Sequence, residues 1–220
     1  MAKILLTAGP TRAHVDDVRY LTNASSGRMA QALAEAALAR GHAVTIVSGP
    51  VHVAYPRRAR VIPVVTTAEM LEASLAELPR VDGVIAAAAP CDFEPVRRLP
   101  GKIPRQGSGL VLRLKPTTDV IATLARRHRP GQWFVAFALE PGADPQRAFE
   151  KITAKRCDLI VVNDVTALEA DRNAVAVFDS RHEHVGSRRA SKRAVAAWLI
   201  RLIESRLVDR PVGGPGPRRV

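Results

Sequence analysis

The chain has 220 residues, of which 47% are hydrophobic and 25% are charged, the composition of an ordinary globular domain. No apolar run approaches the ~18 residues of a membrane-spanning helix, and no signal-peptide pattern is visible, so we expect a cytoplasmic protein. The two cysteines, Cys91 and Cys157, lie far apart and without metal-ligand spacing. They predict neither a disulfide framework nor a zinc site, and we expect both to be packing residues.

The net charge of +12 comes from 27 arginines and 6 lysines against 21 acidic residues. We favour charges spread over solvated faces, because the arginine clusters are scattered along the chain. The alternative is attraction of polyanions, either nucleic acid or highly charged small substrates. Aromatic residues make up only 4% of the chain, which disfavours binding of single-stranded nucleic acid by base stacking.

The beginning of the chain predicts a buried strand at Lys3–Ala8, a loop rich in glycine, serine and asparagine, and a helix at 26–40 that ends at Gly41. A strand that opens through such a loop onto a helix leaves backbone N–H groups and a positive dipole end facing one spot. This arrangement binds anions, above all phosphates. The loop is too long for the tight G-x-G-x-x-G turn that binds NAD.

Strands and helices then alternate. We expect strands at 42–48, 60–65, 82–89, 133–138 and 159–163, and helices at 67–78, 118–127, 144–155 and 191–207. Thr67 is the expected N-cap of the helix that it begins. The alternation predicts an α/β fold: a Rossmann-like, three-layer parallel sheet with helices on both faces.

Residues 91–115 differ from the rest because they are rich in proline and glycine. We expect a flap at about 94–115 that includes a short strand at 110–114. A terminal hairpin is expected from 173–178 and 184–186. Residues 1–207 are expected to form a single nucleotide-binding domain, and 208–220 a disordered tail.

Ligands of parallel α/β sheets bind beyond the carboxyl ends of the strands. The expected site therefore comprises the loops that follow predicted strands: 9–27, Gly49, 89–93, 137–140 and 163–164.

The motifs at these positions resemble the phosphopantothenate–cysteine ligase family. The most specific are Asn23-Ala-Ser-Ser-Gly-Arg-Met29 and Asn163-Asp164-Val165. Further matches, in the same order and spacing, are at 6–12, 47–51, 66–71, 87–93, 101–103, 135–140 and 151–155. The resemblance runs from about Lys3 to Asp179. Many bacterial ligases are fused behind a flavin-dependent decarboxylase, whereas this chain looks free-standing.

The resemblance implies a two-step reaction in coenzyme A biosynthesis. The carboxylate of 4′-phosphopantothenate attacks the α-phosphate of a nucleoside triphosphate, CTP rather than ATP in the usual bacterial form, and the cysteine amine then attacks the acyl-nucleotide. Mg²⁺ is expected to accompany the phosphates. A homodimer is also implied, with the flap near the subunit contact, and a separate flavin-dependent decarboxylase is among the partners that the family suggests.

Two positions match the family's catalytic residues. Asn23 matches the asparagine whose amide contacts the acyl-nucleotide, although an asparagine here could also cap the nearby helix. Lys102 matches the first lysine of the flap. Lys151 and Lys155 match two lysines on one helical face that are expected to reach the triphosphate. An ordinary solvated face is the alternative, but three of only six lysines fall on family positions.

The remaining expected site residues fall into two sets. Asp92, Asp119 and Phe137 match family positions that contact the nucleotide. The full expected nucleotide set is Ala88, Ala89, Asp92, Thr118, Asp119, Val120, Phe137, Lys151 and Lys155. The expected phosphate or substrate loop is Gly9, Thr11, Ser25, Ser26 and Gly27. No residue is expected to be a metal ligand, since the histidines show no metal spacing.

The sequence also departs from the family pattern around the nucleotide pocket. Pro90-Cys91 precedes Asp92, and the flap has Pro104-Arg105 after Lys102 in place of two lysines. Thr118 and Leu139 replace proline and alanine. These changes bear on base choice, rate and substrate, so a divergent member of the family with an altered substrate is an alternative; they leave Asn23 untouched.

Two other functions are alternatives. A nicotinamide-dependent oxidoreductase would require a G-x-G-x-x-G turn and an acid or arginine after the second strand, where Ser48-Gly49-Pro50 stands. A nucleic-acid-binding protein would use the +12 charge, but the sequence contains no recognition motif.

Overall fold

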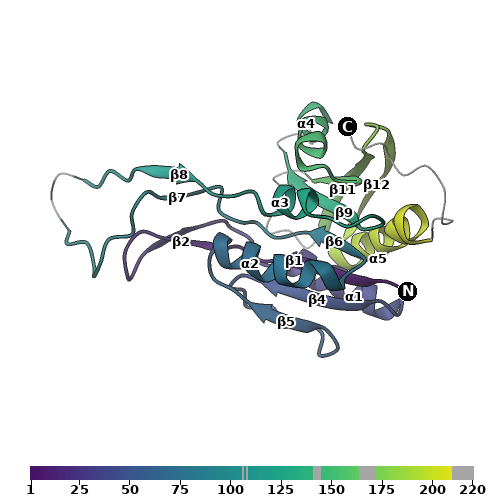
Figure 1. Cartoon of the computed structure of the whole chain (residues 1–220), viewed down its shortest axis with the longest axis horizontal. Coiled ribbons are helices and arrows are strands. Elements are labelled where there is room, and N and C mark those ends of the chain that lie inside the picture. Colours follow the sequence, from purple (N-terminus) through teal and green to yellow (C-terminus); the bar gives the residue numbers. More distant parts are fainter. Residues whose placement is uncertain (106, 108, 141–144, 164–171, 210–220) are drawn as a thin grey trace.

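The computed structural model describes residues 1–105, 107, 109–140, 145–163 and 172–209. Its main feature is an eight-stranded sheet in the order β12-β11-β10-β9-β6-β1-β4-β5 (Figure 1). The strands are β1 (Lys3–Ala8), β4 (Ala43–Ser48), β5 (Arg60–Pro63), β6 (Gly83–Ala86), β9 (Trp133–Leu139), β10 (Leu159–Asn163), β11 (Arg172–Asp179) and β12 (His184–Ser191).

The sheet is parallel from β5 to β10. Strands β11 and β12 continue it as an antiparallel hairpin, with Leu159 paired to Asp179 and Arg172 paired to Ser191. Two reversals make β12 run in the same direction as β10 and β1. The α/β, Rossmann-like prediction is confirmed, and β12 extends five residues beyond the expected hairpin end at Gly186.

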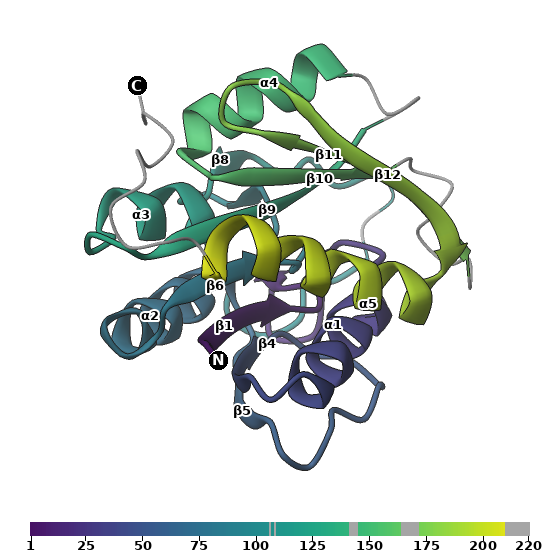
Figure 2. The ribbon, with the colours of Figure 1, turned by 90° about the vertical axis from the view of Figure 1, so that its right-hand side faces the viewer.

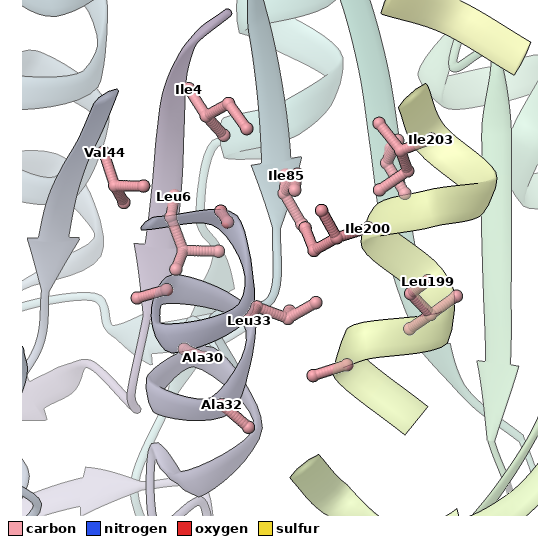
Figure 3. Packing of buried hydrophobic residues seen from close by; sticks show 14 of the residues in the cluster. Ile4, Leu6, Ala30, Ala32, Leu33, Val44, Ile85, Leu199, Ile200 and Ile203 are labelled. Carbon is pink, nitrogen blue, oxygen red and sulfur yellow. The ribbon is translucent and has the colours of Figure 1, made fainter. Parts of the chain in front are cut away.

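Helices cover both faces of the sheet (Figure 2). Helices α1 (Arg28–Ala39) and α5 (Lys192–Ile203) pack on one face, and a π-helical turn, η4 (Glu204–Val208), follows α5. Figure 3 shows Leu33 of α1 and Ile200 of α5 meeting Leu6 and Ile85 of the sheet. The other face carries α2 (Thr67–Glu77), the short 3-10 helix η1 (Leu78–Arg80), α3 (Val120–Arg126) and α4 (Pro145–Lys155).

Two small hairpins form an arm that projects from the carboxyl edge of the sheet (Figure 1). The first pairs β2 (Arg12–His14) with β3 (Tyr20–Thr22), and the second pairs β7 (Phe93–Pro95) with β8 (Leu114–Pro116). The first hairpin lies in a segment that the sequence predicted to be only a loop. The strand predicted at 110–114 is wrong except for Leu114: the observed strand β8 covers Leu114–Pro116. Its position is set by pairing with β7, which a local sequence pattern does not show.

Two aspartates clamp the hairpins together. The buried Asp16 carboxylate accepts from the Ile103 N–H at 3.1 Å, and Asp17 accepts from the Gly101 N–H at 2.6 Å and from Arg98 at 2.8 Å. Burial raises the pKa of Asp16, but three backbone N–H donors and Arg19 outweigh it and hold the pKa below its ordinary value of 3.8. Hydrogen bonds from Gly101 and Arg98 also lower the pKa of Asp17. The arm is therefore held by charge and hydrogen bonds.

Helix ends follow local capping chemistry. The predicted cap Thr67 is wrong by one residue, because Thr66 forms a capping box with Glu69. Two other predicted starts shift inward. Helix α1 begins at Arg28 after Gly27 in the left-handed conformation, and α3 begins at Val120 after its cap Asp119. Gly41 lies just beyond α1 with φ +85°, where glycine is favoured, as expected.

A buried relay joins the beginning of β1 to the end of α5. The Ala2 N–H donates to His42 Nδ1 at 3.0 Å, so the imidazole proton resides on Nε2, which donates to Glu204 Oε1 at 2.9 Å. Glu204 also pairs with Arg40 of the α1 C-cap.

The expected tail at 208–220 lies outside the described residues from 210 onward. Within the described part of the chain, no helix is both long and apolar enough to cross a bilayer.

Candidate active site at the carboxyl edge of the sheet

The carboxyl ends of β1, β6, β9 and β10 open into a cavity of about 840 Å³. Its lining comes from the loop before α1, the segment after β6, the start of α3, the end of β9 and the inner face of α4, together with the starts of β11 and α5. Segments that are far apart in the sequence therefore meet at the edge where the strand-end rule places ligands. Of the loops predicted there, Asp164 lies outside the described residues.

Most of the expected site residues line this cavity. They are Asn23, Ser25, Ser26, Gly27, Ala88, Ala89, Asp92, Thr118, Asp119, Val120, Phe137, Lys151 and Lys155. Three expected residues lie outside the lining: Gly9, Thr11 and Lys102. The departures Pro90, Cys91 and Leu139 also line the cavity, so the altered positions and the expected ligand contacts share one space.

Asn23 is held by the segment that follows β6. Its side-chain nitrogen Nδ2 donates to the carbonyl of Ala89 at 3.1 Å and to that of Pro90 at 2.9 Å. Both partners are acceptors, so only the nitrogen end of the carboxamide can face them. Both N–H groups of the carboxamide are thus used by the protein, which leaves the oxygen Oδ1 for contact with a ligand.

Thr11 holds the segment that follows β6 through hydrogen bonds of its side chain. Its buried hydroxyl accepts from the Cys91 N–H at 2.8 Å and forms a hydrogen bond with the Thr67 hydroxyl at 2.8 Å. The Cys91 carbonyl in turn accepts from the Thr117 hydroxyl at 2.6 Å. This network links the arm, α2 and the segment before α3, so Thr11 fixes the backbone beneath Asn23 rather than facing the cavity.

Gly9 is required by close packing. It has φ +68°, and a Cβ there would lie 2.6 Å from the Val51 side chain and 3.2 Å from the Gly49 carbonyl oxygen. Gly27 has φ +74° and would also meet Val51, at 2.8 Å. Both glycines allow the loop before α1 to pass close to the segment after β4.

The two lysines of α4 reach the cavity as members of ion pairs. Lys151 pairs with the buried carboxylate of Glu140, which also lies 3.9 Å from Arg147. Lys155 lies 2.5 Å from Asp119, whose other oxygen accepts from the Ala122 N–H and caps α3. These lysines are therefore positioned by acids, and a phosphate would have to compete with those acids for them.

Lys102 lies in the arm, exposed, between Gly101 and Ile103, whose backbone groups the Asp16–Asp17 clamp holds. It is fixed in backbone position but does not line the cavity in this conformation.

Asn163, in the loop expected at 163–164, lines the cavity. The sequence did not single out Arg28, Met29, Asn173 or Lys192, which line it too. Arg28 and Met29 lie within the motif at 23–29. Asn173 and Lys192 gave no signal, because only the full length of β12 brings the start of α5 to this edge. Among the described residues, no group of three His, Cys, Asp or Glu side chains could hold a metal ion.

Comparison with protein families gives a match over residues 1–207 to the model described as "DNA/pantothenate metabolism flavoprotein C-terminal domain". The chain belongs to this family. The curated relatives include the coenzyme A biosynthesis bifunctional protein CoaBC of Bacillus subtilis, 42% identical over 80% of this chain and 44% of the relative. The Escherichia coli K12 protein of the same name is 38% identical over 80% of this chain and 45% of its own length.

A third relative, named cysteine/cysteine sulfinic acid decarboxylase, from an unknown prokaryotic organism, is 37% identical over 91% of this chain and 57% of its own length. The chain thus spans about half the length of the curated relatives it matches. Among solved structures, the C-terminal domain of CoaBC superposes with a TM-score of 0.78 at 32% identity, covering 94% of this chain and 98% of that domain.

A second structure, described as Cab2 mutant H337A in complex with phosphopantothenate-cysteine, has a TM-score of 0.80 at 16% identity, over 93% of this chain and 86% of that one. At that identity the likeness concerns the fold. The family match does not favour the nicotinamide-dependent oxidoreductase.

Proposed function

We propose that this chain joins 4′-phosphopantothenate to cysteine through an acyl-nucleotide. In the first step the substrate carboxylate forms a bond to the α-phosphorus of the nucleotide, and pyrophosphate leaves. In the second step the cysteine amine attacks the acyl carbon, the nucleoside monophosphate leaves, and the amine loses a proton. Neither step requires an enzyme nucleophile; both require anionic and polar groups to be gathered and oriented.

The observation that carries the proposal is the meeting of Asn23, Asp92, Phe137 and the lysines of α4 around one cavity. These residues come from four separate segments, and each matches a position where the ligase family contacts its reactants. The 42% identity to a coenzyme A biosynthesis protein supports the same reaction.

Pro90 is compatible with this chemistry. Proline has no N–H to offer a nucleotide, but its carbonyl oxygen is the nearer of the two that hold the Asn23 carboxamide. Because that carboxamide presents its oxygen, we propose that Asn23 accepts a hydrogen bond from the amine in the second step.

We propose CTP as the nucleotide, with ATP as the alternative, and Mg²⁺ as its companion. The ion supplies charge neutralisation at the phosphates. Asp119, which lines the cavity, is paired with Lys155, and Glu140, which lies outside the lining, is paired with Lys151; this fits an ion held mainly by the phosphates. Such a reaction belongs in the cytoplasm, where nucleoside triphosphates are made.

The direct test supplies purified protein with phosphopantothenate, cysteine, Mg²⁺ and either CTP, ATP or UTP, and follows pyrophosphate release and the ligated product by mass spectrometry. We expect release with CTP that depends on phosphopantothenate. Absence of both signals with every nucleotide contradicts the proposal.

Asn23→Asp separates the two steps. A carboxylate at this position faces two carbonyl oxygens and loses both hydrogen bonds, so amine capture is expected to fall about 100-fold while pyrophosphate release falls less, and acyl-nucleotide accumulates. Gln31→Glu is the matched control, because Gln31 donates to the Ala54 carbonyl at 2.8 Å outside the cavity. Equal loss of both steps in the Asn23 variant argues against the assigned role.

We further propose a homodimer formed through the arm, and a separate flavin-dependent decarboxylase that receives the product. The arm exposes large apolar side chains: Val18, Phe93, Val96, Leu110 and Val111. An apolar surface of this kind is typical of a protein interface. Light scattering should give twice the 23.8 kDa chain mass, and Val111→Asp should lower it. A wild-type mass of one chain contradicts the dimer.

A further inference from the structure

A smaller pocket of about 280 Å³ lies beside the main cavity. We call it the side pocket. It is lined by strands β2 and β3, the segment 23–26 and the rings of Pro10 and Pro50, at the place where the arm leaves the sheet (Figure 1). Residues 23–26 line the main cavity as well, so this segment is a wall that the two spaces share.

Arg12 is the one charged residue among the described residues that line the side pocket. Its guanidinium carbon Cζ lies 4.2 Å from the centre of the Tyr20 ring, and no acidic side chain pairs with it in the described part of the chain. By contrast, Lys151 and Lys155 of the main cavity each pair with an acid. The aromatic ring orients the guanidinium plane without cancelling its charge, so Arg12 can form a two-pronged pair with a carboxylate.

The backbone that carries Arg12 is anchored to the sheet rather than to the tip of the arm. The Arg12 N–H donates to the Val65 carbonyl, just after β5, at 2.8 Å. Across the hairpin, the Thr22 hydroxyl donates to the Thr11 carbonyl at 2.8 Å. Arg12 therefore keeps its place beside the shared wall if the tip of the arm moves.

The side pocket matches the one reactant of the proposed ligation that carries no phosphate. The main cavity, at about 840 Å³, is within the range of about 300–1,000 Å³ that is usual for ligand sites, whereas the side pocket is just below it. A small amino acid is the matching size. Cysteine has a carboxylate, an amine and a small apolar thiol; the pocket offers a guanidinium, the Asn23 oxygen and two proline rings.

We propose that the side pocket binds cysteine, with its carboxylate on Arg12 and its amine toward Asn23 Oδ1. The inference rests on the proposed function and deepens it by giving the second substrate a site. Because Asn23 lines both spaces, the amine meets the acyl carbon across the shared wall. The C–N bond then forms, the bond from the acyl carbon to the nucleoside monophosphate breaks, and the amine proton passes to water.

Arg12→Gln tests the assignment by comparing two acceptors, cysteine and cysteamine, which is cysteine without its carboxylate. We expect the wild type to prefer cysteine. In Arg12→Gln, kcat/KM should fall about tenfold or more for cysteine and change less than about twofold for cysteamine, because only cysteine loses a charge-assisted pair. Arg97→Gln is the matched control: Arg97 lies in the same arm, exposed and outside both linings, and both acceptors should react as in the wild type.

The first step separates this assignment from a phosphate site. Arg12→Gln should leave the KM for phosphopantothenate and the rate of pyrophosphate release without cysteine within about twofold of the wild type. A raised KM for phosphopantothenate with an unchanged preference for cysteine would mean that Arg12 binds the phosphate monoester, and it overturns the proposal. An unchanged preference with no other effect overturns it as well.

Two milder variants keep the test informative if Arg12→Gln folds poorly. Arg12→Lys retains the charge but not the planar fork, and Tyr20→Leu retains apolar bulk but not the ring that orients Arg12. Each should reduce the preference for cysteine over cysteamine about threefold or more, whereas damage to the fold alone would lower both acceptors equally. A wild-type preference in both variants contradicts the assignment.

A wild-type protein that ligates nothing loses the proposed function but still allows the side pocket to be judged. Saturation-transfer NMR on cysteine mixed with the protein reports binding without turnover. A cysteine signal that Arg12→Gln abolishes and Arg97→Gln preserves retains the site. Absence of the signal in that wild-type protein overturns the site together with the function.

Discussion

The sheet and the arm are stabilised in different ways. The sheet buries large side chains such as Phe134, Leu6 and Ile160 between two layers of helices. The arm has two short hairpins, exposes apolar side chains such as Val111, and depends on the Asp16 and Asp17 carboxylates for its internal contacts. The sheet is thus a fixed frame for the cavity, while the arm has little core of its own.

The difference indicates how the two regions would serve the proposed reaction. A frame that sets the positions of Asn23 and α4 must not move, and apolar packing over many contacts gives that rigidity. Lys102 lies in the arm, outside the cavity lining, so a role at the phosphates would require the arm to move, and the few polar contacts of the arm permit local opening.

The largest effect is expected from Phe134→Ala, which removes a fully buried ring from the middle of the sheet. We expect the free energy of unfolding to fall by about 3–5 kcal/mol, measured by denaturant titration. Arg97→Ala in the arm is the counterpart, because Arg97 is exposed and lies outside the apolar set proposed for the dimer contact. It should change stability by less than about 0.5 kcal/mol. Similar losses in both variants would remove the distinction between the regions.

An intermediate effect is expected at the junction. Thr11→Val keeps the shape of the side chain but leaves the buried Cys91 N–H without its acceptor. We expect the free energy of unfolding, measured by denaturant titration, to fall by about 1–3 kcal/mol. Ligation should also become slower, because the segment that holds Asn23 is released. Thr11→Ser restores the hydroxyl and should recover most of the stability and most of the ligation rate. Full activity in Thr11→Val would show that the network does not position Asn23.

The smallest effect is expected from low pH, which should loosen the Asp16–Asp17 clamp of the arm. The pKa values of Asp16 and Asp17 are lowered in the folded arm, so the clamp is fully formed above their ordinary value of 3.8 and is lost as the pH falls below it. Hydrogen exchange of arm peptides, corrected for intrinsic rates, should therefore rise relative to β9 as the pH falls below 3.8. Asp16→Asn should remove much of this pH dependence.

Glu94→Gln serves as the control for the clamp, since Glu94 forms a 3.2 Å surface pair with Lys115 in the same arm. Exchange that rises equally in the arm and in β9 would mean that acid acts on the whole molecule.

The sheet could be predicted from sequence because its signals are local. Buried strands such as β1 and β10 are short apolar runs, and α1 has helical spacing that ends at Gly41. The hairpins of the arm could not be predicted from sequence, because β2 and β8 are three-residue strands whose positions depend on partners elsewhere in the chain. Thr66 rather than Thr67 caps α2 because Glu69 completes its capping box.

The site shows the same division. Residues at or just after the ends of predicted strands, such as Phe137 and Asp92, could be placed at the carboxyl edge by the topology rule alone. The pairing of Lys151 with Glu140 and of Lys155 with Asp119 could not, since it depends on side-chain reach between elements. The role of Thr11 was expected to be ligand contact, and burial places its hydroxyl in the supporting network instead.

The relay from Ala2 through His42 to Glu204 has a practical consequence for protein engineering. One imidazole ring, that of His42, bridges Ala2, just before β1, and Glu204, at the start of the turn that follows α5. A short covalent loop between residues 209 and 2 would therefore close the chain on the side away from the ligand cavity. New termini could then be opened at the tip of the arm, yielding a circularly permuted protein with the same sheet.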